Sequence, residues 1–461
     1  MLKSIELLPN DKNILDTLYK DPFNRSKDIE AFLKLLTKVQ GHYVISIDGE
    51  WGSGKTFFVK QCSMVLDVLR DKGRLTSEKK EKVLHLPLLG HENLRKNLKG
   101  QYYVYFDAWA NDSYDNPIVA ILNTLIKHLT VFEKANFKKI YDIFEEIGQN
   151  FFNKKFGIDL ASLKRILDTK EIDDIKKQED LHQYIEKIIN NLIADGQRLN
   201  IFIDELDRCK PSFAVKLLEQ VKHYFLLDNV TFIFSTNIAE LSKTIDKYYG
   251  NGFRGDRYLN RFFDLFLSIP KIDSKSYFKY LISKEPQMVF EKNEISIIRY
   301  LNMSLRNINR FVANNQIIDY EKLIRNPEIF TQTDKDIYMD ILWAIVPIII
   351  GFRVTNPIQG NLFLAGKEGH FFTKVLSVTI FWDLLKYDDN LEDRMLALCE
   401  ITTSDGLEKN KEKISRKIYS KLFAVTTDVT QIKTEADHFW YAVSQNLNDI
   451  TNTISRNLNL D

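Results

Sequence analysis

The chain has 461 residues, of which 28% are charged, and its formal net charge is +1. This length is too great for one compact core and predicts two or three domains. The near-neutral charge argues against a protein drawn to DNA or to an anionic membrane by overall attraction. Binding to nucleic acid is therefore left open, because the net charge gives no indication for it.

The cysteines and the apolar segments bear on the compartment. Cys62, Cys209 and Cys399 are far apart, odd in number and form no C-x-x-C pair, which argues against a disulfide framework or a structural zinc site. The first residues lack the apolar core of a signal peptide. The longest apolar run, residues 341–352, is too short to span a bilayer and predicts a buried helix. We therefore expect a cytoplasmic protein without a membrane partner.

A phosphate-binding motif occupies residues 49–56, GEWGSGKT. It follows the apolar run 43–47 and precedes a helical pattern, so it predicts a strand, a glycine-rich turn and a helix. The stretch fits the P-loop pattern G-x-x-x-x-G-K-[ST], in which glycines let the backbone N–H groups point inward and the helix start adds positive charge. The predicted nucleotide-binding residues are Gly49, Glu50, Trp51, Gly52, Ser53, Gly54, Lys55, Thr56 and Phe57.

Two side chains of this motif have predicted chemical roles. Lys55 is expected to reach the β- and γ-phosphates, and the hydroxyl of Thr56 is expected to ligate Mg²⁺. A turn that carries Gly-Lys-Thr without binding phosphate is the competing interpretation. The motifs further along the chain weigh against it.

The remaining elements follow in chain order. Residues 71–100 look like an irregular or partly helical surface excursion, and residues 117–195 look like a charged, soluble helical insertion. After Pro270 the pattern is helical. Strands alternating with helices imply a mostly parallel sheet. Further strands are predicted at 102–106, 199–203, 230–234 and 265–269, with helices at 213–227 and 238–248.

Carboxylates end the predicted strand 199–203, in the sequence IFIDELDR. This has the Walker B form, an apolar strand that ends in acids at the sheet edge where ligands bind. Asp204 is expected to hold Mg²⁺, directly or through water. Glu205 is expected to be the catalytic base that polarises the attacking water, and Asp207 is the second candidate.

A polar side chain also ends the next predicted strand. Asn237 follows residues 230–234 at the position where related NTPases orient the lytic water or the γ-phosphate, the role called sensor 1. Thr236 is the second choice. An equally open interpretation is that Asn237 caps the helix that begins at Ile238, and both roles are compatible.

Three arginines are candidates for contact with phosphate. Arg257 and Arg261 are spaced i, i+4 and are expected to share one helix face, where either could act as an arginine finger towards a neighbouring subunit. Arg306 begins an amphipathic helix that could act as a lid. Salt-bridged surface arginines are the competing interpretation for each.

These stretches together resemble the KAP family of P-loop NTPases. The resemblance covers about residues 20–320 and depends on residues 48–56 (DGEWGSGKT), 106–109 (FDAW), 204–209 (DELDRC), 258–262 and 305–311. Asp107 stands where the family usually has Asn. Many members carry transmembrane helices between the two Walker motifs, whereas the segment here is charged.

The resemblance implies an α/β fold with a five-stranded, mostly parallel sheet of order 5-1-4-3-2. It also implies ATP and Mg²⁺ as cofactors; no guanine-reading Asn-Lys-x-Asp motif is visible near the fourth or fifth strand. Bacterial relatives often occur in phage-defence neighbourhoods beside a separate effector. The predicted domains are a P-loop core at 1–270 that contains the insertion at 117–195, a helical lid at 271–320 and a helical C-terminal domain at 321–461.

The function expected from these features is Mg²⁺-dependent ATP hydrolysis by a homo-oligomer. Hydrolysis would drive assembly or remodelling of a protein effector, in anti-phage defence by the resemblance. The alternative is a slow nucleotide-bound switch or sensor whose helical C-terminal domain binds a trigger or effector.

Overall fold

The computed structural model of the chain divides into two compact units, which are described separately: Leu8–Lys271, and a second unit that comprises Ile272–Asp461. Most of the predicted insertion at 117–195 lies outside the residues that the structure describes. Those residues are 7–70, 75–114, 116–130, 185–186, 189–190, 193, 196–250, 252–283, 289–318, 331–402, 406–423 and 432–458.

The first unit is built on a five-stranded sheet of order β2-β3-β4-β1-β5. All pairings are parallel. The predicted order 5-1-4-3-2 is therefore confirmed, and β4 lies between the strand before the P-loop and the strand before Asp204. The strands are β1 (Tyr43–Asp48), β2 (Gln101–Asp107), β3 (Arg198–Asp204), β4 (Val230–Thr236) and β5 (Leu265–Ser268).

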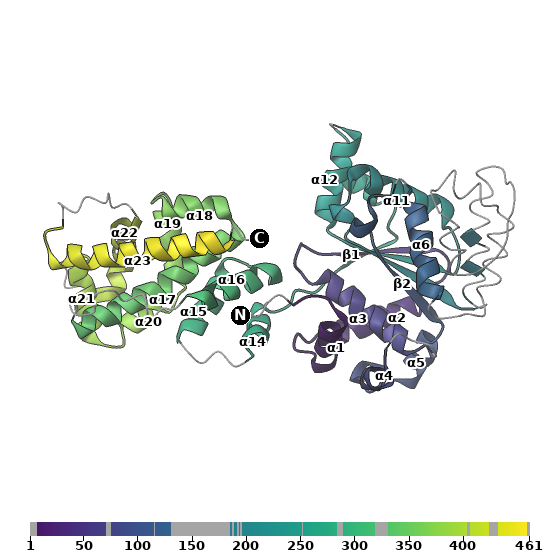
Figure 1. Cartoon of the computed structure of the whole chain (residues 1–461), viewed down its shortest axis with the longest axis horizontal. Coiled ribbons are helices and arrows are strands. Elements are labelled where there is room, and N and C mark those ends of the chain that lie inside the picture. The colour runs from purple at the N-terminus through teal and green to yellow at the C-terminus, as the bar shows by residue number, and fades with distance from the viewer. Residues whose placement is uncertain are drawn as a thin grey trace. The chain divides into compact units, whose positions relative to one another are not determined.

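Helices cover both faces of this sheet (Figure 1). Continuous apolar runs such as residues 230–234 suit strands that are buried on both sides, because parallel sheets carry helices on both faces. One face packs against α1 (Asp11–Lys20), α2 (Ser26–Leu36) and α3 (Lys55–Val68). The other packs against α6 (Pro117–Thr130), α11 (Pro211–Tyr224), α12 (Ile238–Tyr249) and α13 (Gly255–Leu259).

The segment predicted as an irregular or partly helical surface excursion is mostly helical in its described part. Its described part forms α4 (Ser77–Leu84), the 3-10 turn Pro87–Leu89 and α5 (Glu92–Leu98). Leu89 and Leu98 are completely buried in the core beneath β2. The many Lys and Glu residues hid this pattern, because they cover the outer side of short helices whose few leucines point inward.

The strand register places the predicted site residues at one edge of the sheet. Asp48 is paired with Thr236, and Asp204 is paired with Ser235. Because parallel strands end at the same edge, the P-loop, the Asp204 carboxylate and the end of β4 converge there.

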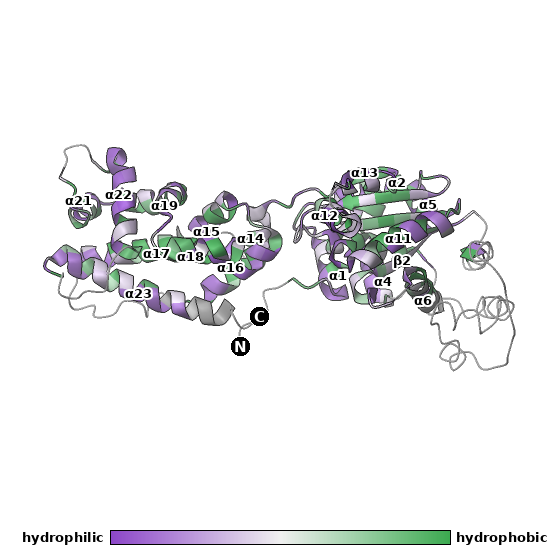
Figure 2. Ribbon diagram, turned by 90° about the horizontal axis from the view of Figure 1, so that it is seen from above, coloured by the Kyte–Doolittle hydropathy of each residue, from purple (hydrophilic) through white to green (hydrophobic). Residues whose placement is uncertain are grey.

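The elements described in the second unit are all helices, as predicted, and α17 (Gln332–Thr355) runs through it. The predicted buried helix at 341–352 is confirmed as part of α17. By length and composition α17 could cross a membrane, but 78% of its most apolar window is buried inside the unit. Figure 2 shows its hydrophobic character. It packs against α15 (Val289–Tyr300), α16 (Leu305–Ile317), α18 (Pro357–Leu364), α21 (Asp389–Leu398) and α23 (Glu435–Leu458).

The regions predicted as a separate lid and C-terminal domain thus meet in this one unit, since α15 and α16 pack against α17. The remaining helices are α14 (Ser274–Ile282), α19 (Gly369–Leu376), α20 (Phe381–Leu385) and α22 (Gly406–Phe423).

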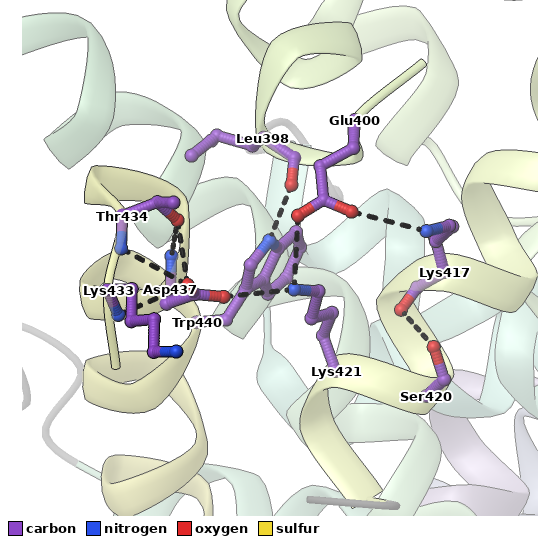
Figure 3. A network of polar contacts seen from close by, with 9 residues as sticks. All are labelled: Leu398, Glu400, Lys417, Ser420, Lys421, Lys433, Thr434, Asp437 and Trp440. Carbon is purple, nitrogen blue, oxygen red and sulfur yellow. Dashed lines mark hydrogen bonds and ion pairs between the residues drawn. The ribbon is translucent and has the colours of Figure 1, made fainter. Parts of the chain in front are cut away.

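Polar contacts join the last helices of this unit (Figure 3). Lys421 lies 3.5 Å from Glu400 and 3.2 Å from Asp437. The indole of Trp440 donates to the carbonyl of Leu398 at 2.8 Å, and the ring is only 1% exposed. Phe439 and Trp440 therefore belong to the core of this unit.

A buried carboxyl on α15 makes the stability of this unit depend on pH. Burial, and after it the neighbouring Glu291, raises the pKa of Glu294 from 4.5 to about 8. Between these values the unfolded chain releases the proton and the folded chain keeps it, so stability falls as pH rises. We expect Glu294→Gln to remove the part of this fall that Glu294 contributes, which is on the order of 3 kcal/mol. Melting temperatures at pH 5 and pH 8 measure it.

The matched control is Glu412→Gln, which alters an exposed glutamate of α22. The Glu294→Gln variant should gain most relative to the native chain at pH 8, whereas the control should follow the native profile. Equal gains at both pH values would contradict the assignment.

Candidate nucleotide site

The loop at residues 49–54 has the backbone that its glycines predict. Gly52 has φ of 78° and Gly54 has φ of 91°, values that side chains disfavour. A Cβ at Gly49 would lie 2.6 Å from Ile269 and 2.7 Å from Ser53, so there is no room for one. The amide of Gly49 donates to the carbonyl of Thr236 at 3.3 Å, which ties the loop to β4.

Lys55 begins α3 and is 9% exposed. Its ammonium group donates to the carbonyls of Gly49 at 2.6 Å and Glu50 at 3.2 Å. Burial lowers the pKa of Lys55, while four carboxylates, led by Asp207 and Asp204, act in the opposite direction. The ammonium group thus lies inside a concave loop where phosphate oxygens could replace the two carbonyls.

The predicted metal ligands Asp204 and Thr56 meet at the sheet edge. The hydroxyl of Thr56 hydrogen bonds to the carboxylate of Asp204, and the hydroxyl of Tyr105 donates to the same carboxylate at 3.0 Å. Asp204 is 1% exposed, and burial raises its pKa against these hydrogen bonds. A buried carboxylate beside a hydroxyl supplies the hard oxygen ligands that Mg²⁺ takes, so these residues fit that ion.

Glu205 lies immediately after β3 in the left-handed region, with φ of 62°. Its side chain pairs with Arg208, Nε to Oε2 at 2.6 Å, and keeps 22% of its surface exposed. Burial and the charge of Asp204 raise the pKa of Glu205, and Arg208 opposes them. Glu205 therefore follows the predicted metal ligand Asp204 and remains accessible to water, as a general base requires.

Asp207, the second candidate for the base, is engaged on both carboxylate oxygens. One accepts a hydrogen bond from the indole of Trp51, and the other accepts from the hydroxyl of Thr236 at 3.1 Å. The side chain is buried at 7% exposure. Asp207 therefore connects the P-loop to the ends of β3 and β4. This gives it a structural role in the site.

Asn237 caps α12, because its side-chain oxygen accepts from the amide of Glu240 at 3.3 Å. The carboxylate of Asp48 accepts from the next amide, that of Ile238, at 2.9 Å. The cap engages only the side-chain oxygen of Asn237. The side-chain nitrogen can therefore still donate a hydrogen bond to phosphate, so the two roles are compatible. The predicted capping role is confirmed, and the sensor role stays a prediction.

Arg257 and Arg261 do not share a helix face, contrary to the expectation from their spacing. The helix α13 ends at Leu259, and Asn260 follows as its cap, so Arg261 lies in the turn beyond it. Both arginines are exposed. The i, i+4 rule fails here because it applies only while the helix continues.

Arg261 lies at the opposite edge of the sheet from the P-loop. It lines a cavity of about 170 Å³ together with His42, which precedes β1, and Asp264, which precedes β5. The P-loop follows β1, a strand of six residues, so roughly 20 Å separate Arg261 from the loop. Contact between Arg261 and nucleotide would therefore require a second molecule.

The other predicted residues are placed as follows. Phe57 is half-buried and packs against the core beneath the sheet, whereas Glu50 is exposed and contributes its carbonyl to the loop. Arg306 is exposed in the first turn of α16, in the other unit, so its contact with nucleotide stays a prediction.

Two residues at this site, Arg25 and Tyr105, belong to no motif in the sequence. Arg25 is 5% exposed and donates to the carbonyls of Ser53 at 3.4 Å and Pro270 at 2.7 Å. The hydroxyl of Tyr105 reaches Asp204 from β2. For Tyr105, the pairing of β2 with β3 was the signal in the sequence, because it brings the ends of these two strands together.

A glycine-rich loop after β1 and a buried carboxylate at the end of β3, joined by the hydroxyl of Thr56, define a P-loop NTPase. The model of the KAP family P-loop domain matches residues 25–328, and the chain belongs to this family. Membership supports nucleotide binding and, in general, nucleotide hydrolysis. None of the curated proteins matches the chain.

Proposed function

We propose that the protein is an oligomeric, Mg²⁺-dependent ATPase that couples hydrolysis to assembly or remodelling of a protein partner. The observation that carries the ATPase is the meeting of Lys55, Thr56 and Asp204 at one sheet edge, with Glu205 next to the metal ligand. By its resemblance to KAP proteins, the partner is an effector in bacterial anti-phage defence, and the protein acts in the cytoplasm.

In this proposal each group of the site has a separate role in the reaction. The loop amides and Lys55 bind the phosphates, and Thr56 and Asp204 hold Mg²⁺, which when bound neutralises charge on the β- and γ-phosphates. Glu205 polarises the water that attacks the γ-phosphate and accepts its proton, so that ADP and phosphate leave. The test is phosphate release by the full-length chain with ATP or GTP, with and without Mg²⁺.

A slow nucleotide-bound switch is the second candidate. It would bind nucleotide at the same loop and hydrolyse it slowly, and its helical C-terminal region would bind a trigger or effector. Steady turnover by the isolated chain supports the first proposal. Nucleotide retained without turnover, until a partner is added, supports the second.

Oligomerisation can be tested with the arginine that lies far from its own P-loop. We expect Arg261→Ala to lower turnover about 10- to 100-fold while nucleotide binding is kept, because a transition-state charge loses its partner. Mixing Arg261→Ala with Lys55→Ala should restore turnover. In a mixed assembly, the Lys55→Ala subunit supplies Arg261 to the intact P-loop of the Arg261→Ala subunit.

Arg257→Ala in the same mixture identifies which arginine acts. Arg254→Ala is the matched control, because Arg254 is an exposed arginine of the same segment that pairs with Asp256. Size-exclusion chromatography with nucleotide reports the assembly. If Arg257→Ala and Arg261→Ala both hydrolyse ATP and assemble like the native chain, these arginines have no role between subunits.

A further inference from the structure

Glu205, Arg208 and Trp109 form a chain of contacts at the carboxyl ends of β2 and β3. The Nε atom of Arg208 lies 2.6 Å from Oε2 of Glu205. The guanidinium carbon of Arg208 lies 5.4 Å from the centre of the Trp109 ring, within the range of a cation–π contact. The carboxylate of Glu205 is thus connected, through Arg208, to the strand next to its own.

The backbone fixes all three residues relative to one another. The amide of Arg208 donates to the carbonyl of Glu205 at 3.2 Å, which closes the 3-10 turn Leu206–Arg208. The amide of Ala108, next to Trp109, donates to the carbonyl of Asp204 at 3.0 Å. The ends of β2 and β3 therefore move together, and with them the ring on which Arg208 lies.

This arrangement restricts a side chain that is otherwise free to rotate. A glutamate has three side-chain torsions, and a base that samples many of them holds water in the right place only part of the time. The ion pair engages Oε2, and the side chain remains 22% exposed, so water still reaches the carboxylate. The planar guanidinium suits this task, because it can bond a carboxylate and lie over a ring at once.

We propose that Arg208, held over Trp109, is the residue that positions the Glu205 carboxylate for hydrolysis. The inference rests on the proposed function, since it assigns a positioning residue to the proposed base. It assigns Trp109, a residue that is 53% exposed, to the same positioning role. An ion pair that served only the fold would leave turnover unaltered in a folded variant.

The test compares turnover and nucleotide affinity in the full-length chain. Arg208→Ala should lower kcat roughly 10- to 100-fold, with KM and the affinity for a fluorescent ATP analogue within about twofold of native. Arg208→Lys should recover part of the loss, because an ammonium group pairs with the carboxylate but cannot stack. Trp109→Ala should lower kcat more than Trp109→Phe, which keeps a ring.

A double-mutant cycle separates this inference from the proposed function. If Arg208 acts through Glu205, Arg208→Ala costs nothing further in the Glu205→Gln background. Lys243→Ala is the matched control, because it removes another i, i+3 ion pair, with Glu240 on α12. Melting curves confirm that each variant is folded.

The outcomes are distinct. An inactive Glu205→Gln variant together with native or raised kcat in Arg208→Ala overturns the inference and leaves the proposed base intact. An equal loss from Arg208→Ala in both backgrounds also overturns it, because the arginine then acts independently of Glu205. Native turnover in Glu205→Gln overturns the assignment of the base, and the positioning role falls with it.

Discussion

Lys55→Ala should lose most of its affinity for nucleotide. The ammonium group is buried inside the loop and contacts the carbonyls of Gly49 and Glu50, so it lies where the phosphates are expected. Its removal deletes a charge-assisted hydrogen bond and leaves the loop with backbone donors alone, which should weaken binding by about 100-fold. Titration with a fluorescent ATP analogue in the presence of Mg²⁺ measures the loss.

The matched control is Lys34→Ala, which removes a lysine paired with Glu30 on the surface of α2. The control should bind nucleotide as the native chain does. Melting curves without nucleotide should show that the Lys55→Ala variant is folded, because burial already disfavours the charged form of this lysine. Unchanged affinity in a folded Lys55→Ala variant would refute the assignment of the P-loop.

Glu205→Gln should bind ATP and fail to hydrolyse it. The substitution keeps the size of the side chain and removes the charge that polarises water, so the expected loss is about 10³-fold in kcat. Nucleotide affinity should stay close to native, because the residue follows the metal ligand and lies outside the loop. Phosphate release and analogue binding, measured on the same preparation, separate the two effects.

Asp207→Asn distinguishes the two candidate bases. Its carboxylate accepts hydrogen bonds from Trp51 and Thr236, so the substitution should lower stability and nucleotide affinity through the P-loop. Retained turnover in Glu205→Gln combined with its loss in a folded Asp207→Asn variant, at native affinity, would reassign the base to Asp207.

The sheet was predictable because its signals are local. Five apolar runs mark the strands, and the glycine motif and the acids after β3 mark the edge where ligands bind. The strand order followed from resemblance, since no local pattern says which strand lies beside β1. The helices within residues 77–98 were only partly predictable, because their few buried leucines are separated by charged residues.

The side-chain contacts within the site were less predictable. Arg25 reaches Pro270 across 245 positions, and Trp51 reaches Asp207 across 156, distances at which sequence spacing carries no information. The expected shared face of Arg257 and Arg261 failed because nothing in the sequence GDRYLNRF marked the end of a five-residue helix. The sequence motifs therefore identified the candidate site residues, whereas the side-chain contacts that position those residues became visible only in the fold.

The pairing of β2 with β3 also bears on how the chain can lengthen. β2 is the outer strand of the sheet, and its register with β3 holds from Gln101 opposite Arg198 to Asp107 opposite Asp204. The connection between these strands is closed at two fixed points, and doubling its length would cost only about 0.6 kcal/mol in chain entropy. A longer connection is therefore compatible with the pairing of β2 and β3 and with the hydrogen bond from Tyr105 to Asp204. The predicted nucleotide site can thus keep its geometry when the connection between its two halves changes in length.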